Sequence, residues 1–178
     1  MTGHVVVLNG EIYNFGDLRG RLVAEGQKFQ STGDTAVMLR ALGLHGPGAV
    51  SWLRGMFAFA CWDPKQRRLL LARDALGIKP LYFARSSDRD AGWSIAFASE
   101  LRALLASGLL GTPHLEPLAV ASTVWNGFVI GPTTSVKGVD LLFPGRLLEF
   151  DSSGKEVRQE DFWRIPDCAP DLAGIVVE

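Results

Sequence analysis

The stretch MFAFACW at residues 56–62 decides the fold class, because nearly every position in it is apolar. A short run of this kind is typical of a strand that is covered on both of its faces. The polar segment DPKQRR follows at residues 63–68, and the apolar run LLLAR comes next at residues 69–73. Two apolar runs around a short polar turn predict an antiparallel hairpin near the middle of a sheet.

Weaker signals of the same types predict the other elements. Runs of β-branched and aromatic residues predict strands at residues 5–8, 81–84, 93–98, 145–151 and 155–163. Apolar residues at helical spacing predict helices that begin near Asn14, Asp34, Ser99 and Glu116, with Asn14 and Ser99 as caps. Because hairpins and helices fall in separate blocks, we expect an α+β layered fold. One domain is expected over residues 1–165, with an irregular tail over 166–178.

The composition excludes several classes of protein. The chain has 178 residues, 47% of them hydrophobic, and a net charge of −1, which is ordinary for a globular domain and does not favour binding to nucleic acid. No apolar run approaches the roughly 20 residues that span a bilayer. The first residues lack the basic segment of a secretory signal, so we expect a cytoplasmic protein. Two cysteines, Cys61 and Cys168, make neither a disulfide framework nor a zinc site.

The triplet Asn9-Gly10-Glu11 is the first candidate for chemistry. A side-chain amide beside an unhindered backbone N–H offers two donors that can stabilise an oxyanion in acyl transfer. Glu11 beside them can accept a hydrogen bond from a ligand ammonium group. Asn-Gly is also the commonest turn dipeptide, and the spacing alone favours a turn at the end of the strand at residues 5–8.

Asp34 is the second candidate, at the predicted start of a helix. A carboxylate there can bind a substrate amino group, but the local pattern is already explained by a helix N-cap, and from that pattern alone we favour the cap.

The loop RDALGIKP at residues 73–80 is the third candidate. Its mixed charges suit either a small anion or an internal pairing of Arg73 with Asp74 that fixes the loop, and we favour the pairing. No histidine lies at metal-type spacing, and no nucleophile stands beside a base in the sequence.

Five stretches occur in the order and spacing of the glutaminase domain of glutamine-hydrolysing asparagine synthetases. They are NGEIYNF at 9–15, STGDT at 31–35, LRGMFAFA at 53–60, LARD with GIKPLY at 71–74 and 77–82, and FASELRAL at 97–104. The chain resembles this family from about Gly3 to Trp163, and residues 131–145 look like the segment that leads out of the domain.

The resemblance implies a class II glutamine amidotransferase domain with the N-terminal-nucleophile hydrolase fold, a four-layer α/β/β/α sandwich of antiparallel sheets. It implies that Asn9 and Gly10 form an oxyanion hole and are the catalytic residues. It further implies that Glu11 lies at the glutamine head group and that Asp34 binds the α-amino group. Asn9, Gly10, Glu11 and Asp34 are thus the expected glutamine-binding residues, with no metal.

The chain departs from this family at both ends. The family's nucleophile is a cysteine made N-terminal by loss of Met, whereas this chain begins Met1-Thr2-Gly3. We therefore expect the nucleophile, the early strands and a glutamine-binding loop to be missing, and neither Cys61 nor Cys168 to replace the nucleophile. The family's ATP-binding loop has no counterpart either. No cofactor is expected in this chain, and ATP and Mg²⁺ belong to the synthetase domain of the family.

Three hypotheses follow. The chain is part of an asparagine synthetase-like protein, inactive alone, whose parent reaction converts aspartate to asparagine with ATP and with glutamine as the ammonia donor. Alternatively, it is a non-catalytic module that binds glutamine or docks to a synthetase subunit. A less favoured third is a hydrolase that uses Thr2 after loss of Met1. The expected partners are glutamine and a synthetase domain or subunit, with no nucleic acid and no membrane. Open sheet edges would make the isolated chain poorly soluble.

Overall fold

Two antiparallel sheets form the centre of the molecule. The structure is a computed structural model, and it describes residues 3–86, 88 and 90–166. Sheet A has the order β1-β2-β3-β7-β8, and sheet B has the order β5-β4-β6. The strands of sheet A are β1 (Val5–Ile12), β2 (Gly55–Asp63), β3 (Arg68–Arg73), β7 (Arg146–Asp151) and β8 (Glu156–Asp161). Those of sheet B are β4 (Tyr82–Arg85), β5 (Ile95–Ala98) and β6 (Val139–Leu141).

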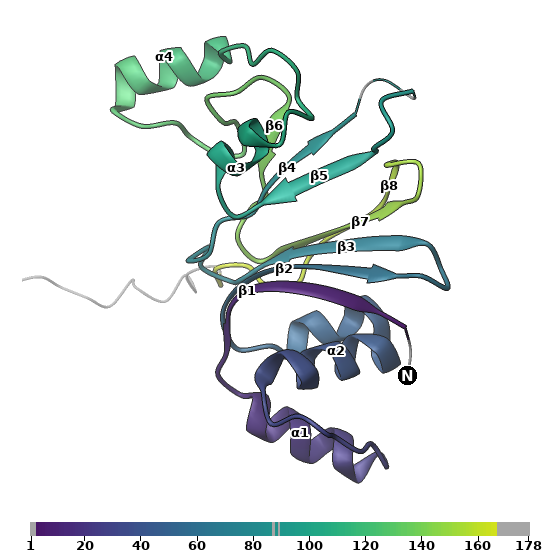
Figure 1. Ribbon diagram of the computed structural model, residues 1–178. Coiled ribbons are helices and arrows are strands. Elements are labelled where there is room, and N and C mark those ends of the chain that lie inside the picture. The colour runs from purple at the N-terminus through teal and green to yellow at the C-terminus, as the bar shows by residue number, and fades with distance from the viewer. Residues whose placement is uncertain (1–2, 87, 89, 167–178) are drawn as a thin grey trace, which may run out of the picture.

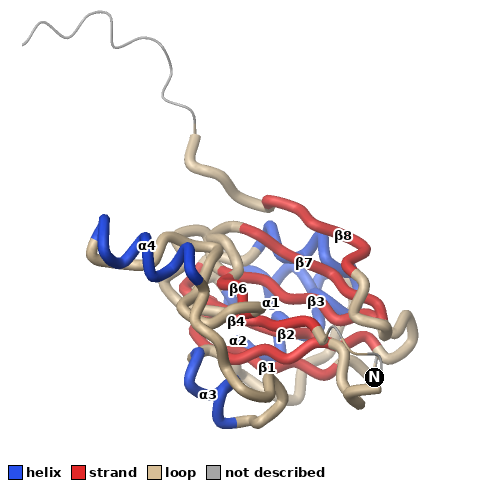
Figure 2. The backbone as a smooth tube through the Cα atoms, turned by 90° about the horizontal axis from the view of Figure 1, so that it is seen from above, coloured by secondary structure: helices blue, strands red, loops and turns tan. Residues whose placement is uncertain are grey.

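Helices lie outside both sheets, which gives four layers (Figures 1 and 2). The helices α1 (Phe15–Ala24) and α2 (Asp34–His45), with the 3-10 helix η1 (Gly46–Trp52), cover the outer face of sheet A. The helices α3 (Leu101–Ala106) and α4 (Pro117–Asn126) lie beyond sheet B. The prediction of an α/β/β/α sandwich is therefore confirmed. The predicted tail at residues 166–178 lies outside the described residues except for its first residue.

The side-chain alternation of β2 explains its unbroken apolar run. Phe57, Phe59 and Cys61 point toward α2 and belong to the core between the helices and sheet A. Ala58 and Ala60 point the other way, into the core between the two sheets. Both faces of β2 are buried, as the sequence predicts.

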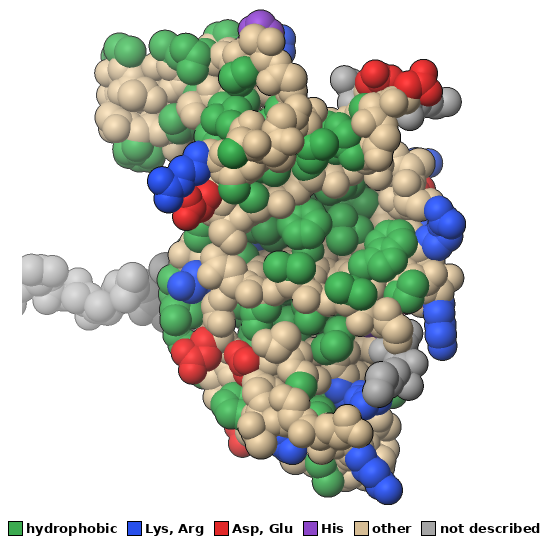
Figure 3. Space-filling view, in the orientation of Figure 1, with side chains coloured by type: hydrophobic (Ala, Val, Ile, Leu, Met, Phe, Trp, Pro, Cys, Tyr) green, Lys and Arg blue, Asp and Glu red, His purple; other side chains and the backbone are tan. Residues whose placement is uncertain are grey.

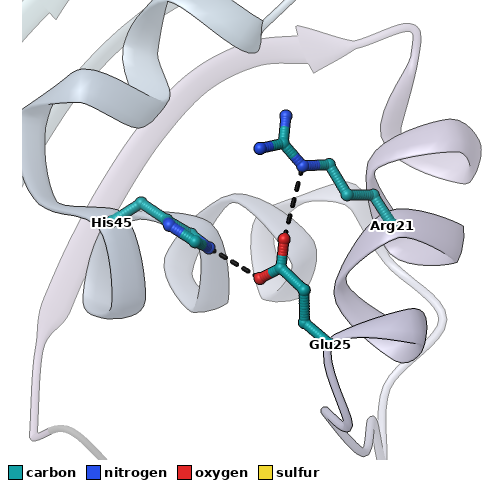
Figure 4. A network of polar contacts seen from close by, with 3 residues as sticks. All are labelled: Arg21, Glu25 and His45. Atoms are coloured by element: carbon teal, nitrogen blue, oxygen red, sulfur yellow. Dashed lines mark hydrogen bonds and ion pairs between the residues drawn. The ribbon is translucent and has the colours of Figure 1, made fainter.

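A polar network joins α1 to α2 at their exposed ends (Figure 4). Nε2 of His45 lies 2.7 Å from Oε2 of Glu25, and Nε of Arg21 donates to Oε1 of Glu25 at 3.4 Å. The Arg21 guanidinium also stacks over the Trp52 ring, 3.7 Å from its centre. The hydrogen bond with His45 is the largest cause that lowers the pKa of Glu25 below its ordinary 4.5.

Of the two predicted helix caps, Asn14 is confirmed in position and Ser99 is wrong. Asn14 stands at the N-cap of α1 but makes no capping bond there. Its Nδ2 donates to the Trp52 carbonyl at 2.9 Å, and its Oδ1 accepts from the Arg54 N–H at 2.9 Å. Asn14 therefore fixes the start of β2 instead of the helix. Glu100, and not Ser99, is the N-cap residue of α3.

Candidate functional site

The four candidate residues gather at the C-terminal end of β1. The predicted turn at Asn9-Gly10 is wrong, because β1 runs on to Ile12 and stays paired with β2, with Gly10 opposite Phe57 and Ile12 opposite Gly55. The triplet is therefore held in a strand with unbroken pairing to β2, and this pairing sets the orientation of each of its groups.

Two glycines make this pairing possible. A Cβ on Gly10, which has φ of 137°, would come within 2.0 Å of the Met56 carbonyl oxygen. A Cβ on Gly55, at φ of 154°, would come within 2.1 Å of the Glu11 carbonyl oxygen. Only glycine fits at either position without moving the main chain. Sequence reasoning assigned no role to Gly55, although it stands in the LRGMFAFA motif.

The main-chain N–H of Gly10 points away from β2. Tyr13 donates its N–H to the Arg54 carbonyl at 2.7 Å, which sets the phase of the ladder. Because hydrogen-bonded and non-hydrogen-bonded pairs alternate along an antiparallel pair, the Gly10 and Phe57 pair is non-hydrogen-bonded. Consistently, the Phe57 N–H donates to Oδ2 of Asp74 at 3.2 Å instead. Since β1 is the first strand of sheet A, the Gly10 N–H faces the open edge of the sheet.

Asp34 lies on this same open edge. Its Oδ2 accepts the N–H of Ile12 at 3.0 Å, and Ile12 is in a non-hydrogen-bonded pair like Gly10. Asp34 is the first residue of α2 and not its cap, which is Gly33. Its Oδ1 accepts the Thr35 N–H at 2.7 Å. The carboxylate is half-buried, so part of it remains accessible to a ligand.

The side chains of Asn9 and Glu11 stand on the face of sheet A that is turned away from α1 and α2. Val6, Leu8 and Ile12 contribute to the core under the helices, so the odd-numbered residues of β1 point to the other face. Asn9 is half-buried and Glu11 is exposed. Within the described part of the chain, neither side chain hydrogen-bonds another residue, so both are available to a ligand. Together with Gly10 and Asp34 they form what we call the open-edge site.

The loop at residues 73–80 has a structural role, as favoured from the sequence, but its charges do not pair with each other. The Asp74 side chain, only 1% exposed, accepts N–H groups from Phe57, Leu76, Ile78 and Lys79. Arg73 donates to the carbonyls of Lys79, Gly77 and Leu142 at 2.6–2.8 Å. Both side chains therefore form their hydrogen bonds with backbone groups, and they fix the loop that connects β3 in sheet A to β4 in sheet B.

Cys61 does not offer a nucleophile. It is 4% exposed, and burial, helped by the nearby Asp63, raises the pKa of its thiol to about 11. The thiolate is the reactive form, and it is almost absent at neutral pH. Thr2 and Cys168, the other residues considered as nucleophiles, lie outside the described residues.

The described residues hold neither a metal-binding cluster nor a membrane-spanning helix. Among residues 3–86, 88 and 90–166, no three His, Cys, Asp or Glu residues cluster in a way that could hold a metal ion. In the same ranges, no helix combines the length and the hydropathy needed to cross a bilayer.

Comparisons with known proteins agree with this architecture. The model of the glutamine amidotransferase domain family matches residues 1–163. Asparagine synthetase [glutamine-hydrolyzing] 3 of Bacillus subtilis is 32% identical over 91% of this chain, and a putative asparagine synthetase of Methanocaldococcus jannaschii is 32% identical over 93%. The chain spans only 25% and 31% of the lengths of these two relatives.

A solved structure shows the same fold. The glutamine phosphoribosylpyrophosphate amidotransferase of B. subtilis aligns over 89% of this chain and 29% of its own, with a TM-score of 0.59 and 20% identity. At this identity the likeness concerns the fold alone.

Proposed function

Because the chain belongs to the glutamine amidotransferase domain family, we propose that its open-edge site binds glutamine along the free side of β1. One observation carries the proposal. The Gly10 N–H and the Ile12 N–H, which donates to the Asp34 carboxylate at 3.0 Å, lie on the same strand edge. They are two residues apart, which is about 7 Å in a β-strand. This spacing is comparable to the length of an extended glutamine between its α-amino group and its side-chain carbonyl oxygen.

Each residue then has a chemical task. The carboxylate of Asp34 pairs with the α-ammonium group of glutamine, and Glu11 lies beside the same head group. The Gly10 N–H and the Asn9 amide donate to the side-chain carbonyl oxygen. When a nucleophile attacks this carbonyl, the two donors stabilise the negative charge that forms on the oxygen. Removal of one such donor typically lowers kcat by about 100- to 1,000-fold.

The parent reaction is a second part of the proposal. The relatives named above are glutamine-hydrolysing asparagine synthetases, and this chain corresponds to about a quarter of their length. We propose that it belongs to a protein that converts aspartate to asparagine with ammonia from glutamine. ATP and Mg²⁺ are assigned to the synthetase portion, which this chain does not match. The chain alone is expected to bind glutamine and to release no ammonia, since Cys61 is not available as a nucleophile.

Calorimetry with glutamine on the isolated chain tests the binding site. We expect a saturable heat signal in the wild type and at least tenfold weaker binding in Asp34→Asn, because the ammonium group loses its ionic partner. Asp17→Asn is the matched control, since Asp17 is an exposed carboxylate in the first turn of α1. It should bind glutamine as the wild type does. A wild-type chain without a glutamine signal, or an unchanged Asp34→Asn variant, would show the proposal to be wrong.

An ammonia-release assay separates binding from hydrolysis. Wild type and Thr2→Ala should give the same background rate with saturating glutamine. A wild-type rate that disappears in Thr2→Ala would instead identify Thr2 as a nucleophile and reject an inactive isolated chain.

A further inference from the structure

The helix α4 and the loop after it present a large apolar surface. Six of their side chains are exposed, namely Leu118, Val120, Val124, Trp125, Phe128 and Ile130, and we call them the α4 patch. Trp125 is 88% exposed and Val124 is 83% exposed. Large contiguous apolar patches are uncommon on the surface of monomeric proteins and often mark a binding surface. Figure 3 shows hydrophobic side chains gathered on this part of the molecule.

The patch also lacks charge. Residues 117–136 contain no Asp, Glu, Lys or Arg. The helix α1, by contrast, carries the exposed residues Asp17 and Arg21 and the half-buried Arg19, as is usual for a helix that faces solvent. The composition of α4 therefore resembles that of a helix with a partner, although it buries only Ala119 in this chain.

The patch is held in a defined shape. The Glu116 side chain accepts the Leu118 N–H at the start of α4, and Gly127 ends the helix with a left-handed conformation. The loop then folds back, because the Ser122 hydroxyl donates to the Phe128 carbonyl at 2.8 Å and accepts the Ile130 N–H at 3.1 Å. A partner would therefore meet a preformed surface, which reduces the entropy lost on binding.

The position of the patch indicates its partner. The end of β8, the C-terminal end of β1 and α4 all lie toward one end of the sandwich (Figures 1 and 2). The family match ends at residue 163, close to the end of β8 at Asp161, whereas the relatives are three to four times as long as the part that this chain matches. A domain placed after β8 would lie at this end, near both α4 and the open-edge site.

We propose that the α4 patch is the docking surface for an ATP-dependent synthetase domain, joined to this chain or carried by a separate subunit. The inference rests on the proposed function, since it takes its partner from the parent reaction. A membrane is the weaker candidate for the same surface. Helices that lie on membranes combine an apolar face with Lys and Arg, and α4 contains no Lys and no Arg.

An exchange experiment tests this docking. This chain replaces the matching segment in the full-length Bacillus subtilis asparagine synthetase 3, and hydrogen exchange of residues 117–130 is measured in the joined protein and in the chain alone. We expect exchange at least tenfold slower in the joined protein. Val124→Glu should restore fast exchange by placing a charge in the interface. Val23→Glu is the matched control, because Val23 is an exposed valine on α1, in the opposite outer layer, and it should have no effect.

Four results would overturn the docking proposal. The first is equal exchange in the joined protein and in the chain alone. The second is a joined protein that cannot make asparagine from added ammonia, because a compatible surface should support the synthetase portion as the native segment does. The third is a homodimer of the chain that Val124→Glu dissociates in sedimentation, which would assign the patch to a second copy. The fourth is flotation with phosphatidylglycerol vesicles that Val124→Glu abolishes, which would assign it to a membrane.

The docking proposal and the glutamine-binding proposal can be rejected independently of each other. Calorimetry on the isolated chain reports on glutamine without any partner, and hydrogen exchange of residues 117–130 reports on docking without glutamine. A chain that docks but does not bind glutamine would reject the proposed function and keep the surface.

Discussion

The two outer helical layers differ sharply in how much they bury, although both contain apolar helices. In α2, the side chains of Val37, Met38, Ala41 and Leu42 are all buried against sheet A. In α4, Ala119 alone is buried. The two sheets differ as well, because sheet A has five strands of six to nine residues and sheet B has three strands of three or four. The apolar content of a helix therefore does not show whether its own chain covers it.

The largest expected effect compares one residue from each layer. Met38→Ala should lower the free energy of unfolding by about 2–5 kcal/mol, because it leaves a cavity under α2. Leu118→Ala should change it by less than about 0.5 kcal/mol, because Leu118 is 70% exposed. Urea unfolding of the two variants gives both values. A similar loss in both would mean that α4 is covered within the isolated chain, and would contradict the comparison.

The next effect concerns Asp74, in the loop that connects sheet A to sheet B. Asp74→Asn should cost about 3 kcal/mol, because an amide group replaces one carboxylate oxygen and leaves buried N–H donors without an acceptor. Asp17→Asn on the surface of α1 serves as the control and should be nearly neutral. Thermal unfolding by circular dichroism measures both. If Asp74→Asn also leaves the stability unchanged, this carboxylate does not stabilise the loop between the two sheets.

The smallest effect concerns pH and the polar network at the exposed ends of α1 and α2. The folded-state pKa of Glu25 is depressed, so its stabilising contribution is present above its ordinary 4.5 and is lost as the pH falls through the lower folded value. Glu25→Gln should therefore lower the urea midpoint slightly at pH 7 and match the wild type at acid pH. Glu100→Gln in the other helical layer should change the midpoint less, since Glu100 pairs with Arg102, two residues away on the same exposed segment. Parallel pH profiles for the two variants would contradict a specific role of the network in Figure 4.

The local sequence pattern was sufficient to predict the elements that form between residues close together in the chain. The β2–β3 hairpin follows from its apolar runs, and α1 and α2 follow from helical spacing. The extension of β1 was missed because Asn-Gly normally forms a turn, whereas here Gly10 and Gly55 let two strands approach closely. The three-residue strand β6 was missed as well, since it is defined by its pairing with β4, more than fifty residues earlier in the chain.

The local pattern singled out the residues of the candidate site, but only the resemblance favoured a functional role for them. The spacing alone favoured a turn at Asn9-Gly10 and a cap at Asp34. What places Asp34 beside Gly10 is the hydrogen bond from Ile12 and the phase of the ladder with β2. Both depend on contacts between distant segments. The roles of Asn9, Gly10, Glu11 and Asp34 toward glutamine remain predictions for the calorimetry described above.

The proposed donor at Gly10 belongs to the peptide group, and this affects how the position responds to mutagenesis. A scan of side chains at residue 10 would show strong intolerance, but the cause would be collision with the Met56 carbonyl oxygen and not loss of the donor. Semisynthesis can replace the peptide bond between residues 9 and 10 with an ester. The ester has an oxygen in place of the N–H, and residue 10 still has no side chain. A loss of glutamine affinity in that ester analogue would identify the donor itself.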